Sequence, residues 1–394
     1  MRFTQHVSYI LGAAVWASYG LTTSCAPVKF SAVPVDQTTT VSCASLGTGC
    51  VTTDNGHNGK TQNYDYSVTI APAAADILFV VDNSASMSSI QHNISSRFST
   101  FFNAIQSLDY HIAITTTDIS GGSNSARAIN QNGALQDGRL IVFGNGSQVL
   151  TPNAGSSTAN YFQNAIQRNE TFTCENYLST HNCAASNGCT DYGTYCPSED
   201  TRGIVAARLA VQRNEASFLR DGVNLSIVII SNADERAAGG RIPNYLQPTA
   251  ADQPSSFVSA IKGAFPNKPL TVDSIIIQPG DSGCLQAQTF SSTVFGWTGN
   301  YYQQLTGLTG GVQGSVCAGD YGQQMGQIAS TITNQVSSVN LPCAPDHNQI
   351  NVVFTPTSSA VGYQLGGSNN QQVQFAQALP ANTKVEVKFT CTTN

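Results

Sequence analysis

The middle of the chain alternates between two patterns of apolar residues. Short apolar runs of strand length are each followed by a segment in which apolar residues recur at spacings of three and four, the period of a helix. The strand candidates are residues 77–81, 111–116, 139–143, 225–230 and 272–277. The helix candidates are residues 87–108, 155–168, 202–213, 253–264, 299–308 and 322–338. This alternation predicts an α/β fold built on a doubly wound, mostly parallel sheet.

The last part of the chain has a strand-like character instead. Residues 350–354, 372–375 and 384–390 are rich in β-formers, and Cys343 and Cys391 bracket them. A unit of this size has little room for a core, so a disulfide between its ends would stabilise it. The pattern predicts a small β-module at the C-terminus.

Four regions follow from these patterns. The α/β domain is predicted to lie between an exported N-terminal segment, with the pair Cys43 and Cys50 and edge strands, and the β-module. The predicted boundaries are 1–24 for a signal peptide, 25–73 for the N-terminal segment, 74–340 for the α/β domain and 341–394 for the β-module.

The composition is typical of an exported protein. Charged residues make up 10% of the chain, against about 25% in an ordinary globular protein, and small polar residues replace them. Arg2 precedes a moderately apolar segment, residues 7–21, that is short for a membrane span and typical of a signal peptide. The formal net charge of −6, without a basic cluster, argues against nucleic acid as a partner.

The chain holds 11 cysteines, and the first of them directly follows the signal segment. A small residue before Cys25 resembles the cleavage site of bacterial lipoproteins, which predicts a lipid anchor at Cys25. The other cysteines are then an even set, compatible with disulfides in an oxidising compartment. The alternative is that Cys25 is an odd thiol or pairs elsewhere. We expect the bacterial cell envelope, at the outer membrane or surface, with a periplasmic or secreted protein as the alternative.

One strand end carries candidate chemistry. The buried run 77–81 ends at Asp82, and Ser84 and Ser86 follow at alternate positions before a helix begins. Open α/β sheets bind their ligands at the carboxyl ends of the strands, where this turn lies. Carboxylate and hydroxyl oxygens suit a hard cation such as Mg²⁺, which keeps several waters. The alternative is helix capping, because Asp and Ser side chains accept hydrogen bonds from first-turn N–H groups.

The Asp-x-Ser-x-Ser pattern, between a buried strand and an amphipathic helix, resembles the metal-ion-dependent adhesion site of von Willebrand factor A (VWA) domains. Residues 302–311 and the C-terminal β-module also resemble the end of exported bacterial A-domain proteins, so the resemblance covers about residues 75–394. It implies a VWA or Rossmann-like fold in which Asp82, Ser84 and Ser86 hold Mg²⁺ directly or through water. Mn²⁺ or Ca²⁺ could replace Mg²⁺.

The same resemblance implies further site residues. Thr201, at the entry to an apolar-faced helix, matches the threonine that the family places there, with a plain N-cap as the alternative. The family's acid normally follows the next buried strand directly, where this chain has Asn232. Asp234, two residues later, is the expected metal ligand, and Asn232 is the neutral alternative. Asp118 is expected to lie next to the metal ligands without binding the cation itself.

A cysteine-rich insertion, residues 169–200, leads into Thr201. Two disulfides inside it would stiffen it and lower the ordering cost of binding. Tyr177, Tyr192 and Tyr195 are candidate contacts for a partner, because tyrosine is enriched at interfaces. The alternative is that the insertion only shields a sheet edge. Its cysteines are Cys174, Cys183, Cys189 and Cys196.

These features predict an adhesion or recognition protein whose bound cation holds a carboxylate of a protein or glycan partner, with membrane contact only through the lipid anchor. Residues 280–283, Gly-Asp-Ser-Gly, resemble the nucleophile motif of trypsin-like proteases, but the histidine and aspartate contexts of those enzymes do not occur here. We therefore expect no enzyme activity. The alternative function is a structural envelope scaffold with a degenerate, metal-free site, which Asn232 favours.

Overall fold

The computed structural model describes the greater part of the chain from residue 51 onward. The described ranges are 51–57, 62–70, 74–119, 136–181, 195–197, 201–236, 247–266, 268–289, 296–336, 338–341, 343–366, 370–376 and 384–393. The predicted signal peptide, Cys25, Cys43, Cys50, Cys183, Cys189 and Tyr192 lie outside the described residues. Among the described helices, none combines the length and the apolar character that a membrane span requires.

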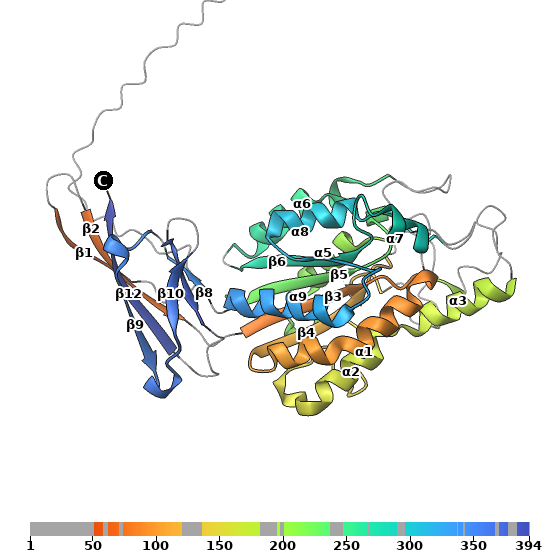
Figure 1. Ribbon diagram of the computed structural model, residues 1–394, viewed down its shortest axis with the longest axis horizontal. Coiled ribbons are helices and arrows are strands. Elements are labelled where there is room, and N and C mark those ends of the chain that lie inside the picture. The colour runs from red at the N-terminus through yellow and green to blue at the C-terminus, as the bar shows by residue number, and fades with distance from the viewer. Residues whose placement is uncertain are drawn as a thin grey trace, which may run out of the picture. The chain divides into compact units, whose positions relative to one another are not determined.

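A parallel sheet forms the centre of the α/β domain (Figure 1). Its described strands run in the order β4-β3-β5-β6-β7, and every neighbouring pair is parallel. The bounds are β3 Ala74–Val81, β4 Asp109–Thr116, β5 Asn224–Ile230, β6 Leu270–Ile276 and β7 Gln313–Ser315. Residues 77–81 are fully buried, because β3 lies between two other strands and under helices on both sides. This arrangement confirms the predicted doubly wound α/β fold.

Helices cover both faces of the sheet, and the alternation of side chains along β3 separates the two cores. Phe79 and its neighbours two residues away pack with α1, α2 and α9, whereas Leu78 and Val80 pack with α5, α6 and α8. Figure 1 shows the two helical layers on opposite sides of the strands. The bounds are α1 Ser88–Ile105, α2 Thr158–Ile166, α5 Gly203–Arg213, α6 Pro254–Ala264, α8 Asn300–Thr309 and α9 Tyr321–Val336.

Further helices lie in the connections. The described ones include two α-helices, α3 Asn169–His181 in the cysteine-rich insertion and α7 Ser282–Ala287 after β6. The 3₁₀ helices are η1 Ala85–Met87, η2 Pro152–Ser157, η3 Glu215–Ser217, η5 Ala250–Asp252, η6 Asp346–Asn348 and η7 Thr357–Ser359.

Within the central sheet, one predicted strand is wrong and one described strand was not predicted. Residues 139–143 run beside β4, and two hydrogen bonds join them to it: the N–H of Ile141 donates to the carbonyl of Ile114 at 2.9 Å, and the hydroxyl of Thr115 donates to the carbonyl of Arg139 at 2.9 Å. The segment turns back after Phe143, so no ladder forms. β7 was missed because it is three residues long and contains glycine in place of an apolar run. A Cβ at Gly314 would lie 2.2 Å from the Oε1 atom of Gln324, so a side chain at this position would displace the Gln324 amide.

The strands outside the α/β domain come from both ends of the chain. An antiparallel sheet has the order β1-β2-β12-β9, so β2 pairs with β12 along its whole length. Its bounds are β1 Val51–His57, β2 Gln62–Ile70, β9 Ile350–Thr355 and β12 Lys384–Thr393. The regions predicted as separate, 25–73 and 341–394, therefore share one sheet, and the α/β domain lies between them in the sequence.

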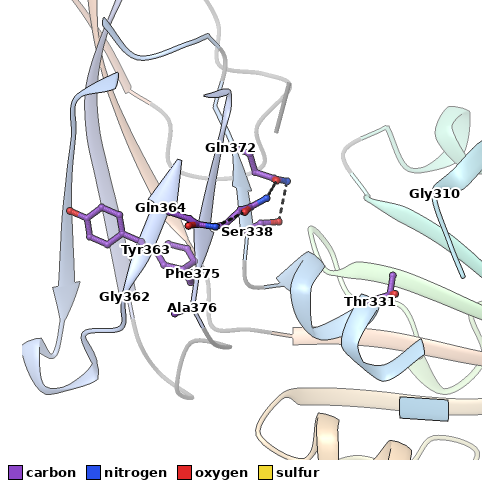
Figure 2. A pocket seen from close by; sticks show the side chains of 10 residues that line it. Gly310, Thr331, Ser338, Gly362, Tyr363, Gln364, Gln372, Phe375 and Ala376 are labelled. Carbon is purple, nitrogen blue, oxygen red and sulfur yellow. Dashed lines mark hydrogen bonds between the residues drawn. The ribbon is translucent and has the colours of Figure 1, made fainter. Parts of the chain in front are cut away.

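A second small sheet has the order β10-β11-β8, with bounds β10 Tyr363–Gly366, β11 Gln372–Phe375 and β8 Ser338–Asn340. A row of hydrogen-bonded glutamine side chains crosses this sheet. These residues line a pocket, shown in Figure 2. Gln364 donates to Gln374 at 3.3 Å, Gln374 to Gln372 at 2.9 Å, and Gln372 to Ser338 at 3.2 Å. Such cross-strand pairs stabilise register in a sheet with little core.

Disulfides stabilise the chain at several points. Cys174 is bonded to Cys196 and Cys284 to Cys317, and Cys343 is also disulfide-bonded. The first pair confirms that the insertion is internally bridged. The side chain of Cys391, the predicted partner of Cys343, lies outside the described part of the structure.

Candidate metal site at the carboxyl edge of the sheet

Asp82 is the first residue after β3, and its carboxylate is fixed between two strands. Its N–H donates to the carbonyl of Ile230, at the end of β5, at 2.9 Å. Its Oδ1 accepts from the N–H of Ser84 at 2.9 Å, and its Oδ2 accepts from the hydroxyl of Ser231 at 2.6 Å. The residue is 1% exposed. A buried strand end therefore presents a single carboxylate, as the sequence pattern predicts.

Three further oxygen-bearing side chains adjoin it. The hydroxyls of Ser84 and Ser86 lie 3.3 Å apart, and the hydroxyl of Ser86 donates to Oδ1 of Asn232 at 3.2 Å. Ser86 belongs to the 3₁₀ turn η1, which directs its side chain toward the loop after β5. The structure thus brings Asp82, Ser84, Ser86 and Asn232 together.

The helix-capping alternative does not account for the two serines. Ser84 stands at the N-cap of η1 but its side chain makes no capping hydrogen bond. The N-cap of α1 is Met87, which has no side chain for that role. Both hydroxyls are therefore available at the sheet edge rather than bonded to a helix terminus.

Thr201 lies at the same edge, between the loops that follow β4 and β5. Its backbone forms an isolated bridge with Asp118, and its carbonyl accepts from the N–H of Arg236 at 2.5 Å. Among the described residues, none forms a hydrogen bond with its hydroxyl, although Thr201 is only 3% exposed. Asp118 is 1% exposed and is the partner of Thr201 in this bridge, so it lies next to a predicted ligand, as expected.

Asp234 has a different position from the one expected of a metal ligand. Its Oδ2 accepts from the N–H of Asn300 and its Oδ1 from the N–H of Tyr301, both at 3.0 Å, so it caps the N-terminus of α8. Burial raises the pKa of Asp234 to about 6. The expectation that residues 232 and 234 share a side assumed an extended loop, but the chain bends at 232 and 233. Of the two candidates, the structure places Asn232 beside Ser86.

Within the described part of the chain, Asp82 lacks the cationic partner that three other buried acids have, a property that it shares with the buried Asp234 and Asp273. Asp76 pairs with Lys268, Glu170 with Arg168, and Asp252 with Arg202. Among the described residues, no Lys or Arg pairs with Asp82, and burial raises its pKa while hydrogen bonds from Ser231 and Ser84 lower it. Isolated charge is costly to bury, and a cation beside this carboxylate would offset that cost.

The donor set fits a hard cation and excludes a thiolate or imidazole site. One carboxylate, three hydroxyls and one amide oxygen are the ligands that Mg²⁺ takes together with water. The described residues contain no cluster of three or more His, Cys, Asp or Glu side chains that could hold a metal. A site with one carboxylate has a low ligand charge, which predicts weak affinity.

The insertion begins directly against the turn that carries Asp82, Ser84 and Ser86. The side chain of Asn83 donates to Oε1 of Glu170 at 3.2 Å, and the hydroxyl of Thr171 donates to the carbonyl of Asn83 at 2.8 Å. Glu170 is fully buried, and its position on α3 had no local sequence signal. Gln91 of α1 adds a third contact, from its Nε2 to the carbonyl of Asp82 at 2.9 Å. The N-terminal end of the insertion therefore holds this turn in place through hydrogen bonds to Asn83.

The tyrosines of the insertion have different exposures. Tyr177 is 7% exposed, since its ring stacks on Tyr195 at 4.6 Å and on His181 at 4.4 Å between centroids. Tyr195 is 41% exposed. Tyr177 thus packs beside the Cys174–Cys196 disulfide, and the described aromatic surface of the insertion includes Tyr195.

The protease-like motif has a structural role in the described fold. Asp281 is the N-cap of α7, and its Oδ1 accepts from the N–H of Cys284 at 2.8 Å. Gly280 has φ of +89°, a conformation that favours glycine. Residues 280–283 therefore form the turn that starts a helix.

Comparisons with known proteins give similarities of fold. No protein-family model matches the chain, and no curated protein matches it. The solved structure of a von Willebrand factor type A protein from Catenulispora acidiphila is 11% identical, with a TM-score of 0.34, over 87% of this chain and 64% of that chain. This chain therefore spans less than two thirds of the length of that structure.

Two further solved structures are similar at the same level. The adhesive tip pilin GBS104 from Group B Streptococcus agalactiae is 9% identical, with a TM-score of 0.31, over 86% of this chain and 84% of that one. The manganese-loaded TRAP protein of Plasmodium vivax is 12% identical, with a TM-score of 0.26, over 63% of this chain and 66% of that one. At these identities and scores the similarities carry no argument about function.

Proposed function

We propose that this protein binds a hard divalent cation, Mg²⁺ first, at the carboxyl edge of its parallel sheet, and that the bound cation holds a carboxylate of a protein or glycan partner. Asp82, Ser84, Ser86 and Asn232 would hold the cation, with Thr201 at the same edge. One observation carries the proposal: Asp82 is a buried carboxylate that no described Lys or Arg neutralises, beside hydroxyl and amide oxygens.

The charge of the site argues for an acidic partner. One carboxylate leaves a bound divalent cation with a single net positive charge, because serine, threonine and asparagine side chains are neutral. Asp234 is not among the proposed ligands, since its oxygens accept from N–H groups of α8. A carboxylate therefore complements the open coordination position better than a neutral group.

We propose binding rather than hydrolysis as the role of this site. His111 lies at the amino end of β4, away from the site, where a ring nitrogen bonds to the carbonyl of Phe218 at 2.9 Å, and a ring nitrogen of His92 on α1 bonds to Gln167 at 3.3 Å. The protein is further proposed to be exported, with a lipid anchor at Cys25. The disulfides agree with an oxidising compartment.

A structural scaffold without metal is the second candidate function. Asn232 favours it, because a neutral amide stands where a second carboxylate would tighten cation binding. Under this proposal the Ser84, Ser86 and Asn232 hydrogen bonds would only hold two loops together.

Calorimetric titration of Mg²⁺ and Mn²⁺ into the protein distinguishes the cation-binding function from the metal-free scaffold. We expect saturable binding by wild type, none by Asp82→Ala, and wild-type binding by Asp109→Ala, whose carboxylate lies at the opposite, amino edge of the sheet. Circular dichroism would check that each variant folds. No binding by a folded wild type would favour the scaffold.

The acidic partner can be tested with a defined probe. A carboxymethylated polysaccharide matrix should retain the protein in Mg²⁺ and release it in EDTA, while a matched amidated matrix should not retain it. The protein's own net charge of −6 opposes non-specific retention on the acidic matrix. Equal retention of Asp82→Ala would contradict a cation bridge.

A further inference from the structure

We propose that Gln288 is a positioning residue: it fixes the side-chain amide of Asn232 so that the oxygen, and not the nitrogen, faces Ser86 and the cation. The Cys284–Cys317 disulfide fixes Gln288 in turn. The inference rests on the proposed function, because the orientation of Asn232 matters most when its oxygen is a ligand.

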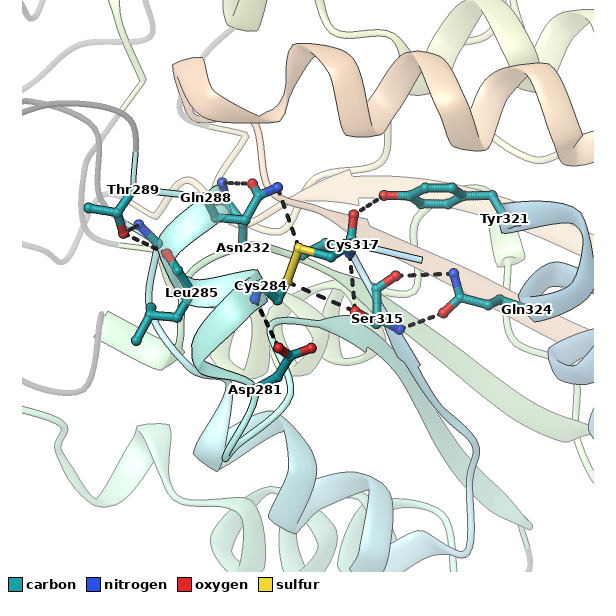
Figure 3. Close-up of a disulfide and its surroundings, with 12 residues drawn as sticks. Asn232, Asp281, Cys284, Leu285, Gln288, Thr289, Ser315, Cys317, Tyr321 and Gln324 are labelled. Atoms are coloured by element: carbon teal, nitrogen blue, oxygen red, sulfur yellow. Dashed lines mark hydrogen bonds between the residues drawn. A yellow bond between two sulfur atoms is a disulfide. The ribbon is translucent and has the colours of Figure 1, made fainter. Parts of the chain in front are cut away.

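The contacts form a continuous chain, and Figure 3 shows its part from Asn232 through Gln288 to Cys317. Oδ1 of Asn232 accepts from Ser86 at 3.2 Å, and Nδ2 of Asn232 donates to Oε1 of Gln288 at 3.1 Å. Nε2 of Gln288 lies 3.8 Å from the Sγ atom of Cys317. Each amide therefore has its oxygen toward the neighbour on one side and its nitrogen toward the neighbour on the other.

An amide side chain has one end that can bind a cation. The carbonyl oxygen has lone pairs, whereas the NH₂ group donates two hydrogens and accepts nothing. If Asn232 turned over, its nitrogen would face Ser86 and repel a cation at the site. Gln288 disfavours that state, because its own oxygen would then lie against the oxygen of Asn232.

The direction of Gln288 depends on the sulfur beside it. A disulfide sulfur accepts hydrogen bonds weakly and donates none, so it favours the NH₂ end of Gln288. The backbone adds a constraint, since the N–H of Gln288 donates to the carbonyl of Cys284 at 2.9 Å at the end of α7. Gln288 is thus tied to both cysteines of the bridge.

The disulfide is itself held in place on the β7 side. The N–H of Cys317 donates to the hydroxyl of Ser315 at 3.1 Å. The backbone of Ser315 is held by Gln324 of α9, which accepts from its N–H at 2.5 Å and donates to its carbonyl at 3.1 Å. The orientation of the Asn232 amide therefore depends on contacts that connect it to α7, β7 and α9.

The test is a double-mutant cycle on Mn²⁺ affinity. Gln288→Met removes the acceptor at similar length and should weaken Mn²⁺ binding about fivefold, the value of one neutral hydrogen bond. Gln288→Glu keeps an acceptor toward Nδ2 of Asn232 and should bind Mn²⁺ at least as tightly as wild type. In the Asn232→Asp background, the carboxylate has no donor end to misplace, so Gln288→Met should cause no loss.

The cycle separates positioning from a general structural role. Equal weakening by Gln288→Met in both backgrounds would overturn the inference, because a collapse of the loop would not depend on residue 232. Loss of affinity in Gln288→Glu equal to that in Gln288→Met would also overturn it.

A second readout is independent of the cation. In NMR spectra of the protein in EDTA, the Asn232 side-chain NH₂ protons should show contacts to Gln288 and none to the Hβ protons of Ser86. The reverse contacts would overturn the inference even if the cation binds. If wild type binds no Mn²⁺ but shows the expected contacts, the proposed function fails while the fixed orientation of Asn232 stands.

Discussion

The hydroxyl of Ser231 donates a 2.6 Å hydrogen bond to the carboxylate of Asp82, which joins the first residue after β3 to the first residue after β5. The same hydroxyl accepts from the N–H of Ala233 at 2.9 Å, so it also shapes the loop that carries Asn232. Besides the Ser86–Asn232 hydrogen bond, the two loops of the candidate site are thus coupled by the side chain of Ser231, which the sequence motif did not include.

Removing that hydroxyl should destabilise the fold. We expect Ser231→Ala to lower the free energy of unfolding by about 2 kcal/mol, because a hydrogen bond to a buried carboxylate is lost. Urea unfolding in EDTA measures this without a contribution from metal. Ser330→Ala, on the exposed face of α9, is the control and should change stability by less than about 0.5 kcal/mol. Equal effects of the two variants would contradict the assigned role of Ser231.

Adding a carboxylate at residue 232 should tighten cation binding. We expect Asn232→Asp to bind Mg²⁺ roughly tenfold more tightly or better, because affinity rises with the charge of the ligands. Without metal the same variant should be less stable than wild type, since two carboxylates would then share a buried edge. Titration calorimetry and thermal unfolding, each with Mg²⁺ and with EDTA, measure both effects. A variant that binds Mg²⁺ no better than wild type would place the cation away from residue 232.

The amino edge of the sheet holds an ion network that should be essential for stability. Asp76 is fully buried, and its carboxylate accepts from Arg220 at 2.8 Å and from Lys268 at 3.0 Å. Asp76→Ala leaves Lys268, 7% exposed, without its acid and should cost about 3–5 kcal/mol of unfolding free energy. Asp109→Ala breaks only an exposed pair with Arg220 and should cost less than about 1 kcal/mol. Chemical denaturation of both variants measures the difference, and similar losses would contradict it.

Stability should fall as pH rises from about 4 to about 7, because of Asp273. Its side chain is fully buried with Oδ2 unpartnered, and burial raises its pKa from 3.8 to about 7. The folded state therefore binds more protons than the unfolded state in this range, and the slope of stability with pH is negative. The shift corresponds to about 4 kcal/mol that is present below pH 4 and lost above pH 7.

Asp273→Asn tests this dependence. The neutral amide should be more stable than wild type at pH 8 and show no such gain at pH 4, as measured by urea unfolding at both values. Asp234→Asn should give a smaller change between pH 4 and pH 6, because the pKa of Asp234 is raised only to about 6. An advantage of Asp273→Asn that does not depend on pH would argue against a buried titrating carboxylate.

The elements of the α/β domain could be predicted because each has a local cause. Apolar runs at 77–81 and 225–230 became central strands, and the spacing in 87–108 became the helix α1. Half of the candidate site could be predicted for the same reason, because its residues are close in the sequence. Asp82, Ser84 and Ser86 lie on one turn after a buried strand, so their proximity depends on five residues of sequence.

The rest depended on contacts between distant segments. Whether Asn232 or Asp234 adjoins Ser86 is decided by a bend and by the helix α8, whose N–H groups engage Asp234. Gln288 has no local signal, since its partners lie 56 residues before it and 29 after it in the chain. The pairing of β2 with β12 joins opposite ends of the chain, and sequence periodicity carries no information about such a register. Periodicity determined which segments form strands and helices, and side-chain packing decided which loops meet at the site.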